Sequence, residues 1–490
     1  MLASDNNSKD NNSKEIKSLN SIGSHKERKY DTIPFRLDFI RDLLNGKNLE
    51  SMIDIDNCET ENFINPSGYK DINSNEDFYS NDTRYVLNKK QHNFYKVINQ
   101  IGGQLKYIKS GTTGHTFKGI VSDNDGININ YAVKVVAYPK RERYGDLNDV
   151  ERPENAELMM IRLLSYFVIK KQSPHIVLPI GTFNTSIKPF VHLIRDNVVD
   201  SSNKKYNEFV DRYNKGEYYD HVSILISEWA NKSDLLDFMR KNYKEFTPLV
   251  WKVVFFQFIS VLAVIQSKFP SFRHNDLKAN NILVHKVSQR KTKFVYTVCR
   301  NRYLIPSIGY QLKIWDFDFA CIPGTVNNSK VSAEWTDQIN VKPEKNRYYD
   351  LHYFFNTLIK KGFFPQFMEE KCVPQEAKDF VNRIIPKKFQ KGKHVSKRGR
   401  LLVNTEYMLP NEILKKDPYF EEFRYNSGKN RRNNKKKSTK KKESIKINNS
   451  DPVSNNLDKF LYEDYKKNVL ERKKMRNNTT NKKYVLSSDK

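Results

Sequence analysis

The pattern of apolar and polar positions divides the chain into a folded centre and two polar ends. Residues 1–30 are rich in Asn, Ser, Asp and Lys and contain almost nothing to bury, so we expect a disordered N-terminus. Apolar residues return over 31–99 with one polar interruption, which predicts an N-terminal extension of one or two helices packed against the main domain. Residues 425–490 are basic and lack apolar partners, and we expect a mostly disordered tail.

The centre changes from strand-like to helix-like patterns near residue 230. Two β-rich runs flank a turn-forming cluster at residues 123–126 and predict a β-hairpin. Residues 154–171 repeat apolar side chains at three- and four-residue spacing, with an acidic start and a basic end, which predicts a helix. The run 248–266 is apolar on nearly every side, as in a helix buried inside a large domain, and helix-rich sequence continues to about residue 424.

Composition indicates a globular protein with an anionic partner. Of the 490 residues, 38% are hydrophobic and 12% aromatic, too many for a wholly disordered chain, and the net charge is +28. This charge suits nucleic acid, an acidic membrane face, nucleotide phosphates or acidic substrate proteins, and it does not choose among them. The four cysteines are scattered without metal-ligand spacing, which favours free thiols in a reducing compartment. No N-terminal signal and no stretch near the ~18 apolar residues that span a bilayer is evident, so we expect a soluble, intracellular protein without a transmembrane segment.

Phosphoryl transfer requires a cradle and a cation for the phosphates, oxygen ligands for Mg²⁺ and a carboxylate that orients the attacking hydroxyl. The segment KSGTTGHTFKG, residues 109–119, offers two glycines in a tight strand-turn-strand, although such a pair also marks an ordinary hairpin. Lys134 follows in YAVKVV, where strand alternation would turn Ala132 and Lys134 to one face. An acidic partner for this lysine is expected on the next helix, where Glu157 fits best and Glu154 is the alternative.

The most specific signal is RHNDLKANNILV, residues 273–284. Asp276 and Asn281, five positions apart, match the base and the metal-binding amide of an H-R-D-L-x-x-x-N loop, and Lys278 is placed to neutralise the transferred phosphoryl group. KIWDFDFA then offers Asp316 as a magnesium ligand in a D-F-G-like turn, with Asp318 where glycine is usual. Acidic turns at strand ends explain either motif alone, but poorly explain both in this order and spacing.

With these motifs, residues from about 106 to 424 resemble a eukaryotic-type serine/threonine protein kinase, and most closely the poxvirus-type virion kinases of large DNA viruses. DFDF in place of DFG-x, the degenerate glycine loop and RYYDLHYFFNTL, with Asp350 as a buried acid that braces the catalytic loop, carry the resemblance. It implies an α+β, two-lobed fold, with a β-rich N-lobe and hinge over 100–230 and a larger helical C-lobe over 231–424. It also implies ATP and Mg²⁺ as cofactors, protein serine and threonine as substrates, and host cytoplasm and virion as locations for a viral protein.

By the same resemblance, SEWANKSDLLDFM is the hinge, with Ser227 as a small gatekeeper, backbone groups of Glu228 and Ala230 near adenine, and Asp234 near the ribose. The expected active site has Asp276 and Lys278 as catalytic residues and Asn281 and Asp316 as metal ligands. The residues expected around ATP are Lys109, Ser110, Gly111, Thr112, Thr113, Gly114, Thr116, Ala132, Lys134, Glu157, Ser227, Glu228, Ala230 and Asp234.

Three departures from the kinase pattern lead to further expectations. Asn275 replaces the arginine that often binds a phosphorylated activation loop, so we predict activity without activation-loop phosphorylation. No A-P-E triplet precedes Asp350, and Pro343 with Glu344 is the nearest candidate. A basic insertion over 285–306 predicts an extended hairpin, which is either a contact for substrate or partner or a solvated surface loop.

Two other classes of protein fit parts of this pattern. Choline kinases and aminoglycoside phosphotransferases share the H-N-D loop, the later asparagine and the later aspartate; Lys278, the hinge and RYYDLHYFF favour a protein kinase. A catalytically inactive scaffold would be expected to lack one of Lys134, Asp276, Asn281 and Asp316. The lysine clusters 435–437 and 440–442 make the tail a candidate for binding nucleic acid or an anionic membrane, or a solubilising segment. The Asn- and Lys-rich composition suits a viral or a cellular protein, and the sequence does not indicate an oligomeric state.

Overall fold

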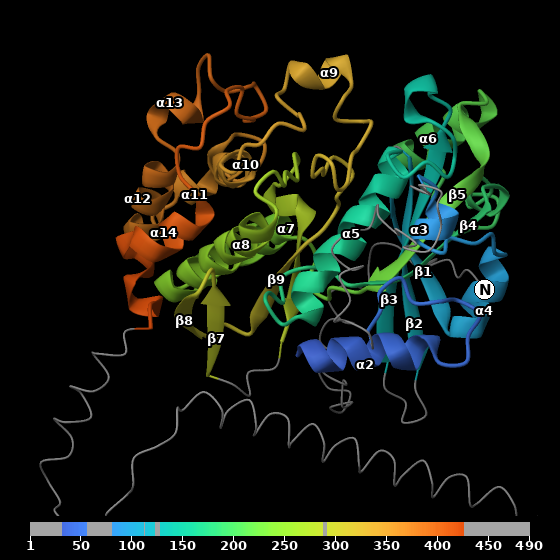
Figure 1. The fold of residues 1–490 in the computed structure, drawn as a ribbon, viewed down its shortest axis with the longest axis horizontal. Coiled ribbons are helices and arrows are strands. Elements are labelled where there is room, and N and C mark those ends of the chain that lie inside the picture. Colours follow the sequence, from blue (N-terminus) through green and yellow to red (C-terminus); the bar gives the residue numbers. More distant parts are fainter. Residues whose placement is uncertain (1–31, 56–80, 112, 123–127, 288–291, 426–490) are drawn as a thin grey trace, which may run out of the picture. The chain divides into compact units, whose positions relative to one another are not determined.

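A five-stranded antiparallel sheet forms the core of the N-terminal half. The computed structural model describes residues 32–55, 81–111, 113–122, 128–287 and 292–425, and the predicted disordered N-terminus and tail lie outside these ranges. The strands are β1 (Gln104–Ser110), β2 (Gly114–Ser122), β3 (Asn128–Pro139), β4 (Pro179–Ser186) and β5 (Tyr218–Glu228), in the order β1-β2-β3-β5-β4 (Figure 1).

The predicted hairpin is confirmed in its strands, because β2 pairs with β3 from Gly114 opposite Val136 to Ser122 opposite Asn128; its turn lies outside the described residues. Gly114 is required by this pairing, since a Cβ there would come within 1.8 Å of the Val135 carbonyl oxygen. Along β3, fully buried Tyr131, Val133 and Val135 alternate with half-buried positions. The alternation turns one set of β3 side chains into the core and leaves the other set, which includes Ala132 and Lys134, half-buried on the opposite face.

The helix predicted over 154–171 is confirmed as α5 (Pro153–Ile169), and it packs against this sheet. Proline at its first position suits a helix N-terminus, because the missing N–H would have no partner there. Nearly all of its side chains are buried, and they include Glu154 and Glu157. A helix with acidic side chains on its buried face needs cations nearby.

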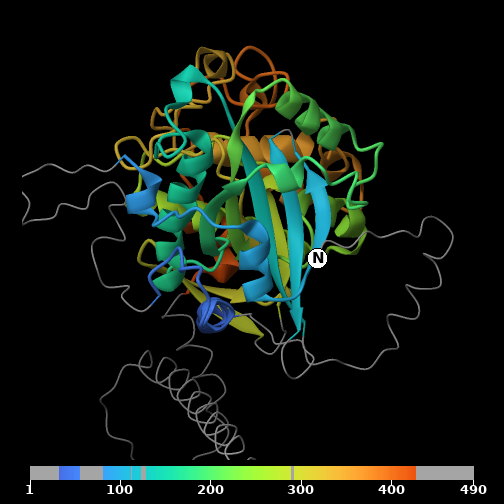
Figure 2. The ribbon, with the colours of Figure 1, turned by 90° about the vertical axis from the view of Figure 1, so that its right-hand side faces the viewer.

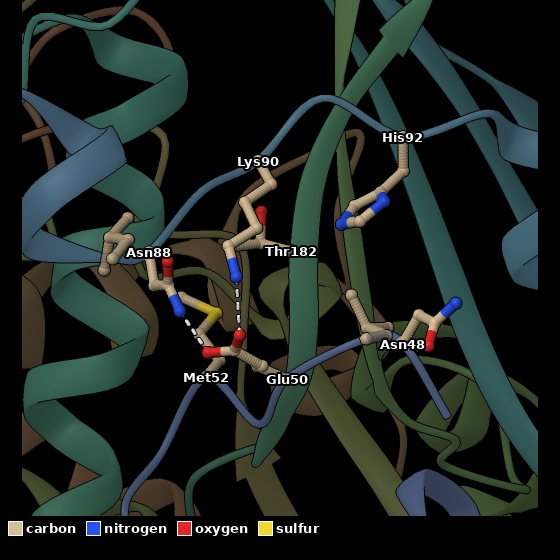
Figure 3. Close-up of a pocket in the computed structure, with 9 residues that line it drawn as sticks. Asn48, Glu50, Met52, Asn88, Lys90, His92 and Thr182 are labelled. Carbon is tan, nitrogen blue, oxygen red and sulfur yellow. Dashed lines mark hydrogen bonds and ion pairs between the residues drawn. The ribbon is translucent and has the colours of Figure 1, made fainter. Parts of the chain in front are cut away.

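The N-terminal extension contributes α2 (Ile33–Leu44), α3 (Thr83–Val86) and α4 (Phe94–Ile101), so its described part has more than the one or two helices predicted, and α4 crosses residue 99. Figure 2 looks onto the sheet, with α4 in front of it. Backbone bonds from Met52 to Ile180 and between residues 90–92 and Asn184 join the extension to β4. Figure 3 shows this junction, where Glu50 pairs with Lys90 at 2.6 Å in a small pocket lined by Thr182.

A buried ion pair joins α2 to the end of β5. Arg36 is fully buried, and its Nε lies 2.6 Å from Oε1 of Glu228. The same guanidinium donates to the carbonyl oxygens of Pro174 and Ile176, and Lys313 lies 3.2 Å from the other carboxylate oxygen. Burial alone would raise the pKa of Glu228, but the two cations lower it to about 2. The extension is thereby fixed to the segment that was predicted to be the hinge.

The rest of the described chain is mainly helical and surrounds α8 (Pro248–Lys268), the predicted buried helix. The other helices are α7 (Leu235–Asn242), α9 (Glu334–Asp337), α10 (Tyr349–Ile359), α11 (Gln366–Glu369), α12 (Gln375–Ile384), α13 (Lys387–Gln390) and α14 (Pro410–Lys416). Short 3-10 turns are η2 (Glu142–Tyr144), η3 (Lys188–Phe190), η4 (Tyr243–Glu245), η5 (Ala279–Asn281) and η6 (Pro418–Phe423), and α6 (Lys204–Asn214) precedes β5. Aromatic rings fill the core, as where Phe258 stacks on Phe354 with centroids 3.7 Å apart.

Helix α8 corrects one expectation from the sequence. Its most apolar 18-residue window has a mean hydropathy of 2.1, so by length and composition α8 is a candidate membrane span. The expectation that the sequence has no apolar stretch of this length was therefore wrong. In the fold, 78% of that window is buried against other elements. The core helix of a soluble protein passes the same test, and burial against the protein accounts for its apolar surface.

Two small antiparallel pairs follow α8. Strand β6 (Ile282–Lys286) pairs with β9 (Tyr310–Ile314), and between them β7 (Lys293–Val298) pairs with β8 (Asn301–Pro306). The hairpin predicted in the basic insertion is thus confirmed for residues 293–306. Cys299 and Arg300 form its turn with φ of 47° and 68°, which matches the type I′ turn of two-residue hairpins. One face of the hairpin is buried, since Tyr303 and Ile305 are each 1% exposed.

We predict that Arg36→Ala lowers the free energy of unfolding by about 3 kcal/mol, because it leaves Glu228 buried with only one of its two cations. Urea unfolding followed by tryptophan fluorescence measures this change. Arg41→Ala is the matched control on the same helix, since Arg41 is 39% exposed and pairs with Asp38 at the surface. Equal unfolding midpoints for the two variants would contradict the prediction.

Candidate active site

Lys134 is the point where the sheet, α5 and the turn after β9 meet. Its Nζ lies 2.6 Å from Oε1 of Glu157 and 2.9 Å from Oδ1 of Asp316. Burial opposes the charge on Lys134, but Asp316 and Glu157 together raise its pKa above the usual value. Burial would likewise raise the pKa of Asp316, and Lys134 lowers it to about 2. Both groups are therefore charged at neutral pH.

The alternative partner, Glu154, has a different role. It lies 2.9 Å from the buried guanidinium of Arg152 at the start of α5. Burial raises the pKa of Glu154 to about 7, an effect that Arg152 only partly offsets. Of the two candidates, Glu157 is the one in contact with Lys134.

Asp276 lies in a loop that surrounds its carboxylate with donors. Its Oδ2 accepts hydrogen bonds from Lys278 at 2.6 Å and from the side-chain amide of Asn281 at 2.9 Å, and its Oδ1 forms an ion pair with Arg400. The Asn281 amide also donates to the Asp276 carbonyl at 2.9 Å. Because both bonds use its N–H groups, the amide oxygen of Asn281 stays available as a ligand.

Asp350, at the start of α10, binds the backbone of this loop, as predicted. It is 1% exposed, and its two carboxylate oxygens accept the backbone N–H groups of His274 and Asn275 at 2.7 and 2.9 Å. Asn275 has a positive φ of 63°, a conformation that asparagine tolerates better than most residues. Its side chain donates to the Phe319 carbonyl at 3.0 Å, so the residue in the place of the usual arginine ties the loop to the segment after Asp316.

Asp316 also has a positive φ, 66°, at the turn after β9. Phe317 is fully buried against the His274 ring, with centroids 5.1 Å apart, and His274 contacts the Trp315 carbonyl at 3.1 Å. Asp318, which replaces the usual glycine, pairs with Lys330 further along the segment. The two acidic residues of DFDF are thus held by different lysines.

The β1–β2 turn joins β1 to the strand that pairs with Lys134 in the sheet. Thr116 stands opposite both Lys109 on β1 and Lys134 on β3, and Thr116, Ala132 and Lys134 are all half-buried. Gly111 donates its N–H to the Gly114 carbonyl at 2.8 Å, which closes the turn, whereas Thr112 lies outside the described residues. The Ser110 hydroxyl contacts His115 at 2.9 Å, and the Thr113 carbonyl accepts from Ala137.

In the predicted hinge, the backbone N–H of Glu228 is already bonded. The N–H of Glu228 already donates to the Leu178 carbonyl at 3.1 Å, and its side chain is taken by Arg36 and Lys313, so only its carbonyl oxygen stays a candidate for adenine. Ser227 is 1% exposed and pairs with Ala132, and Ala230 is 8% exposed. Asp234 caps α7 by accepting the Asp237 N–H at 2.9 Å; burial raises its pKa, and the charge of Lys109 acts in the opposite direction.

Three residues of the site were missed by sequence reasoning: Arg36, Lys330 and Arg400. Each is recognised only by its partner, and Arg400 lies 124 residues from Asp276. Its guanidinium also donates to the Asn275 carbonyl and to the Tyr349 hydroxyl, and it lies 4.4 Å from the centroid of the Tyr353 ring. The basic run around it gave no signal beyond positive charge. The nearest A-P-E candidate, Glu344, contacts Asn404 and its carbonyl accepts from Arg273.

The oxygen donors near Lys134 suit magnesium better than a soft metal. Within the described ranges, no group of three or more His, Cys, Asp or Glu could hold a metal ion. Mg²⁺ is commonly held by one or two protein oxygen ligands together with substrate phosphates and waters. Asp316, whose side chain is 39% exposed, and the free amide oxygen of Asn281 fit that smaller requirement.

Comparison with known proteins identifies the family of the chain. The family model of the poxvirus serine/threonine protein kinase matches residues 144–404. A protein of Acanthamoeba polyphaga mimivirus, provisionally named serine/threonine-protein kinase R400, is 47% identical over 399 residues, which cover 80% of each chain. Serine/threonine-protein kinase 2 of monkeypox virus is 26% identical over 34% of this chain and 36% of its own, and the fowlpox virus kinase of the same name is 27% identical over 41% and 43%.

These matches make the chain a serine/threonine protein kinase. More narrowly, it belongs to the poxvirus serine/threonine protein kinase family.

We predict that Asp350→Asn lowers kcat about 10- to 100-fold and changes KM for ATP little, because an amide cannot accept both backbone N–H groups of the catalytic loop. Steady-state phosphotransfer measures both constants, and thermal unfolding shows whether the variant is folded. Asp337→Asn, at a residue whose side chain is 62% exposed, is the control. A folded Asp350→Asn protein with wild-type kcat would contradict the prediction.

Proposed function

We propose that this kinase transfers the γ-phosphoryl group of ATP to protein serine and threonine residues through the residues gathered around Lys134 and Asp276. Lys134, positioned by Glu157, binds the phosphates; Asn281 and Asp316 bind Mg²⁺; Asp276 orients the substrate hydroxyl, and Lys278 stabilises the charge that develops in transfer. The observation that carries the proposal is the contact of Lys134 with both Glu157 and Asp316 at 2.6 and 2.9 Å. It unites a phosphate-binding cation with a metal-binding carboxylate.

We further propose that the sheet with α5 and the helical part that follows form two lobes with ATP between them. The contact of Lys134 with Asp316 supports this arrangement, because it joins β3 of the sheet to the turn after β9. The charge of Lys109, on β1, also acts on Asp234 at the start of α7. When bound, Mg²⁺ would neutralise phosphate charge, and Ser227, Ala230, Asp234 and the β1–β2 turn would position the nucleotide.

The geometry leaves one place on Asp276 for a substrate hydroxyl. Each carboxylate oxygen accepts about two hydrogen bonds. Among described residues, Oδ2 already has two donors, Lys278 and Asn281, whereas Oδ1 has only Arg400. The hydroxyl of the acceptor residue would therefore donate to Oδ1, directly beside Arg400.

Family membership favours a protein acceptor over the small-molecule phosphotransferase alternative. Two groups of contacts favour an active enzyme over a scaffold. In one, Lys134 contacts Glu157 and Asp316; in the other, Asn281 contacts Asp276. The relatives are viral proteins, which supports viral assembly or virion proteins as substrates and the infected cell and virion as locations. Binding of nucleic acid or anionic membrane by the tail stays a prediction from its lysines, because residues 426–490 lie outside the described ranges.

We propose that activity does not require activation-loop phosphorylation. Beyond the Asn275 contact with Phe319, Lys330 pairs with Asp318, and Asn328 donates to the carbonyls of Asp318 and Ala320. Ser329 bonds to the Glu151 carbonyl just before α5. These contacts hold the segment after Asp316 without a phosphate. In many kinases a phosphorylated residue of this segment is held instead by the arginine that Asn275 replaces here.

We predict that Asp276→Asn lowers phosphotransfer at least 100-fold, because the amide cannot act as the carboxylate toward the hydroxyl. Labelled ATP with a casein-like protein or with choline, together with autophosphorylation, measures the rate and identifies the acceptor. Asp379→Asn, at an exposed residue of α12, is the control. Undiminished activity in the Asp276 variant, or phosphocholine as the main product, would refute the mechanism.

We also predict that phosphatase treatment leaves the rate of phosphotransfer within about twofold of the untreated enzyme, with dephosphorylation verified by mass spectrometry. Loss of activity after phosphatase treatment would overturn this proposal.

Lys330→Gln should reduce kcat several-fold, because it releases Asp318 from the segment. Lys345→Gln, at an exposed lysine of the same segment, should not reduce kcat.

A further inference from the structure

Next to the catalytic loop lies a small basic hairpin, residues 395–401, whose tip is formed by Lys397 and Arg398. We propose that this hairpin selects protein substrates that carry an acidic or phosphorylated side chain within about two residues of the phosphoacceptor. The proposal rests on the proposed function, since it places the acceptor hydroxyl at Oδ1 of Asp276, and it adds the chemical class of substrate.

Arg400 anchors the hairpin at the catalytic residue. It is 8% exposed, and its contacts with Asp276, the Asn275 carbonyl and the Tyr349 hydroxyl fix it there. The Tyr353 ring lies against the same guanidinium. A donor set of this kind fixes both the position and the orientation of the planar group. The hairpin therefore has a defined place relative to the acceptor hydroxyl.

Backbone hydrogen bonds hold the hairpin in a defined conformation. Val395 and Leu401 form a backbone bridge, Ser396 donates to the Arg400 carbonyl at 2.8 Å, and Gly399 donates to the Ser396 carbonyl at 2.9 Å. Gly399 has a φ of +89°, which suits glycine after a tight turn, and its carbonyl accepts the Asn356 side-chain amide of α10 at 2.9 Å. These bonds place Lys397 and Arg398 at the two central positions of the turn.

The tip carries positive charge that no acidic side chain among the described residues neutralises. Residues 391–403 include five cations and no Asp or Glu; the cations are Lys391, Lys393, Lys397, Arg398 and Arg400. Lys397 and Arg398 are exposed, and neither forms an ion pair with a carboxylate in the part of the chain that the structure describes. Arg400, in contrast, uses its charge on Asp276. The exposed pair is therefore available to an external anion.

The tip of the hairpin lies close enough to Arg400 to contact a substrate bound at Asp276. Two residues span at most about 7 Å, so the backbone of Arg398 lies within that distance of the backbone of Arg400. Burial raises the pKa of Tyr353, and the charges of Arg400 and Arg398 both oppose this rise. In an extended peptide, a side chain one or two residues from the acceptor spans a similar distance. A carboxylate or phosphate there would meet Lys397 and Arg398.

The test compares kcat/KM for three serine peptides of equal length, flanked by glutamate, by alanine or by phosphoserine, at low and physiological salt. For the full-length wild-type protein we expect glutamate and phosphoserine peptides to exceed the alanine peptide at least fivefold, with the difference reduced by salt. Comparing the two anionic peptides shows whether carboxylate or phosphate is preferred.

The decisive variant is Lys397→Gln with Arg398→Gln. It should lower kcat/KM for the anionic peptides about 5- to 20-fold and leave the alanine peptide within about twofold. The matched control, Lys415→Gln with Lys416→Gln, removes the same charge from exposed positions of α14. Lys397→Glu with Arg398→Glu should favour a lysine-flanked peptide, a reversal that loss of structure would not produce.

Equal kcat/KM for the glutamate and alanine peptides in the wild type, or an equal loss on all peptides in the Gln variant, would overturn the inference while leaving the kinase function intact. Preference for anionic peptides that persists unchanged in the Gln variant would place recognition elsewhere and overturn it too. Failure of the wild type to phosphorylate any peptide or casein-like protein would instead refute the proposed function, and the inference with it.

Discussion

The position of Lys134 between two carboxylates is the interaction on which the rest of the site depends. Glu157 and Asp316 would repel one another at such short range without a cation, and Lys134 lies within 2.9 Å of both. Three separate elements must be correct for this contact: the alternation of β3, the buried acidic face of α5, and the positive φ of Asp316. A change in any of them would leave a partly buried charge without its partner, which is costly in free energy.

Sequence reasoning predicted the elements whose signals are local. Helix α5 follows from apolar side chains at three- and four-residue spacing, the β2–β3 hairpin from two β-rich runs around a turn-forming cluster, and α8 from a run that is apolar on nearly every side. The contact of Lys134 with Glu157 follows from the order of the motifs. It could not predict Arg36 or Arg400, whose partners lie 192 and 124 residues away and which sit in no recurring pattern. It also identified α8 as a buried core helix, although this helix has the length and composition of a membrane span as well, and its packing in the fold separates the two.

The extension is more closely tied to the kinase fold than its sequence indicated. Arg36 is fully buried, so its charge would be very unfavourable there without Glu228 and the carbonyls of Pro174 and Ile176. The same pairing neutralises the Glu228 side chain, so a glutamate in the proposed hinge would place no unpaired negative charge beside ATP. Helix α2 and the end of β5 are joined through this one carboxylate.

Arg400 changes how the positive charge of the chain should be understood. A net charge of +28 attracts any polyanion over a distance set by salt, and it cannot distinguish one residue of a substrate from another. In the proposed mechanism, a cation fixed on Asp276 acts within a few ångströms of the substrate hydroxyl, where a bound peptide would exclude water and lower the local dielectric constant. Because Arg400 fixes the hairpin and Lys397 and Arg398 extend from it, the inferred selectivity assigns the choice of acceptor residue to charge at this place, whereas charge elsewhere would contribute mainly to the rate of encounter.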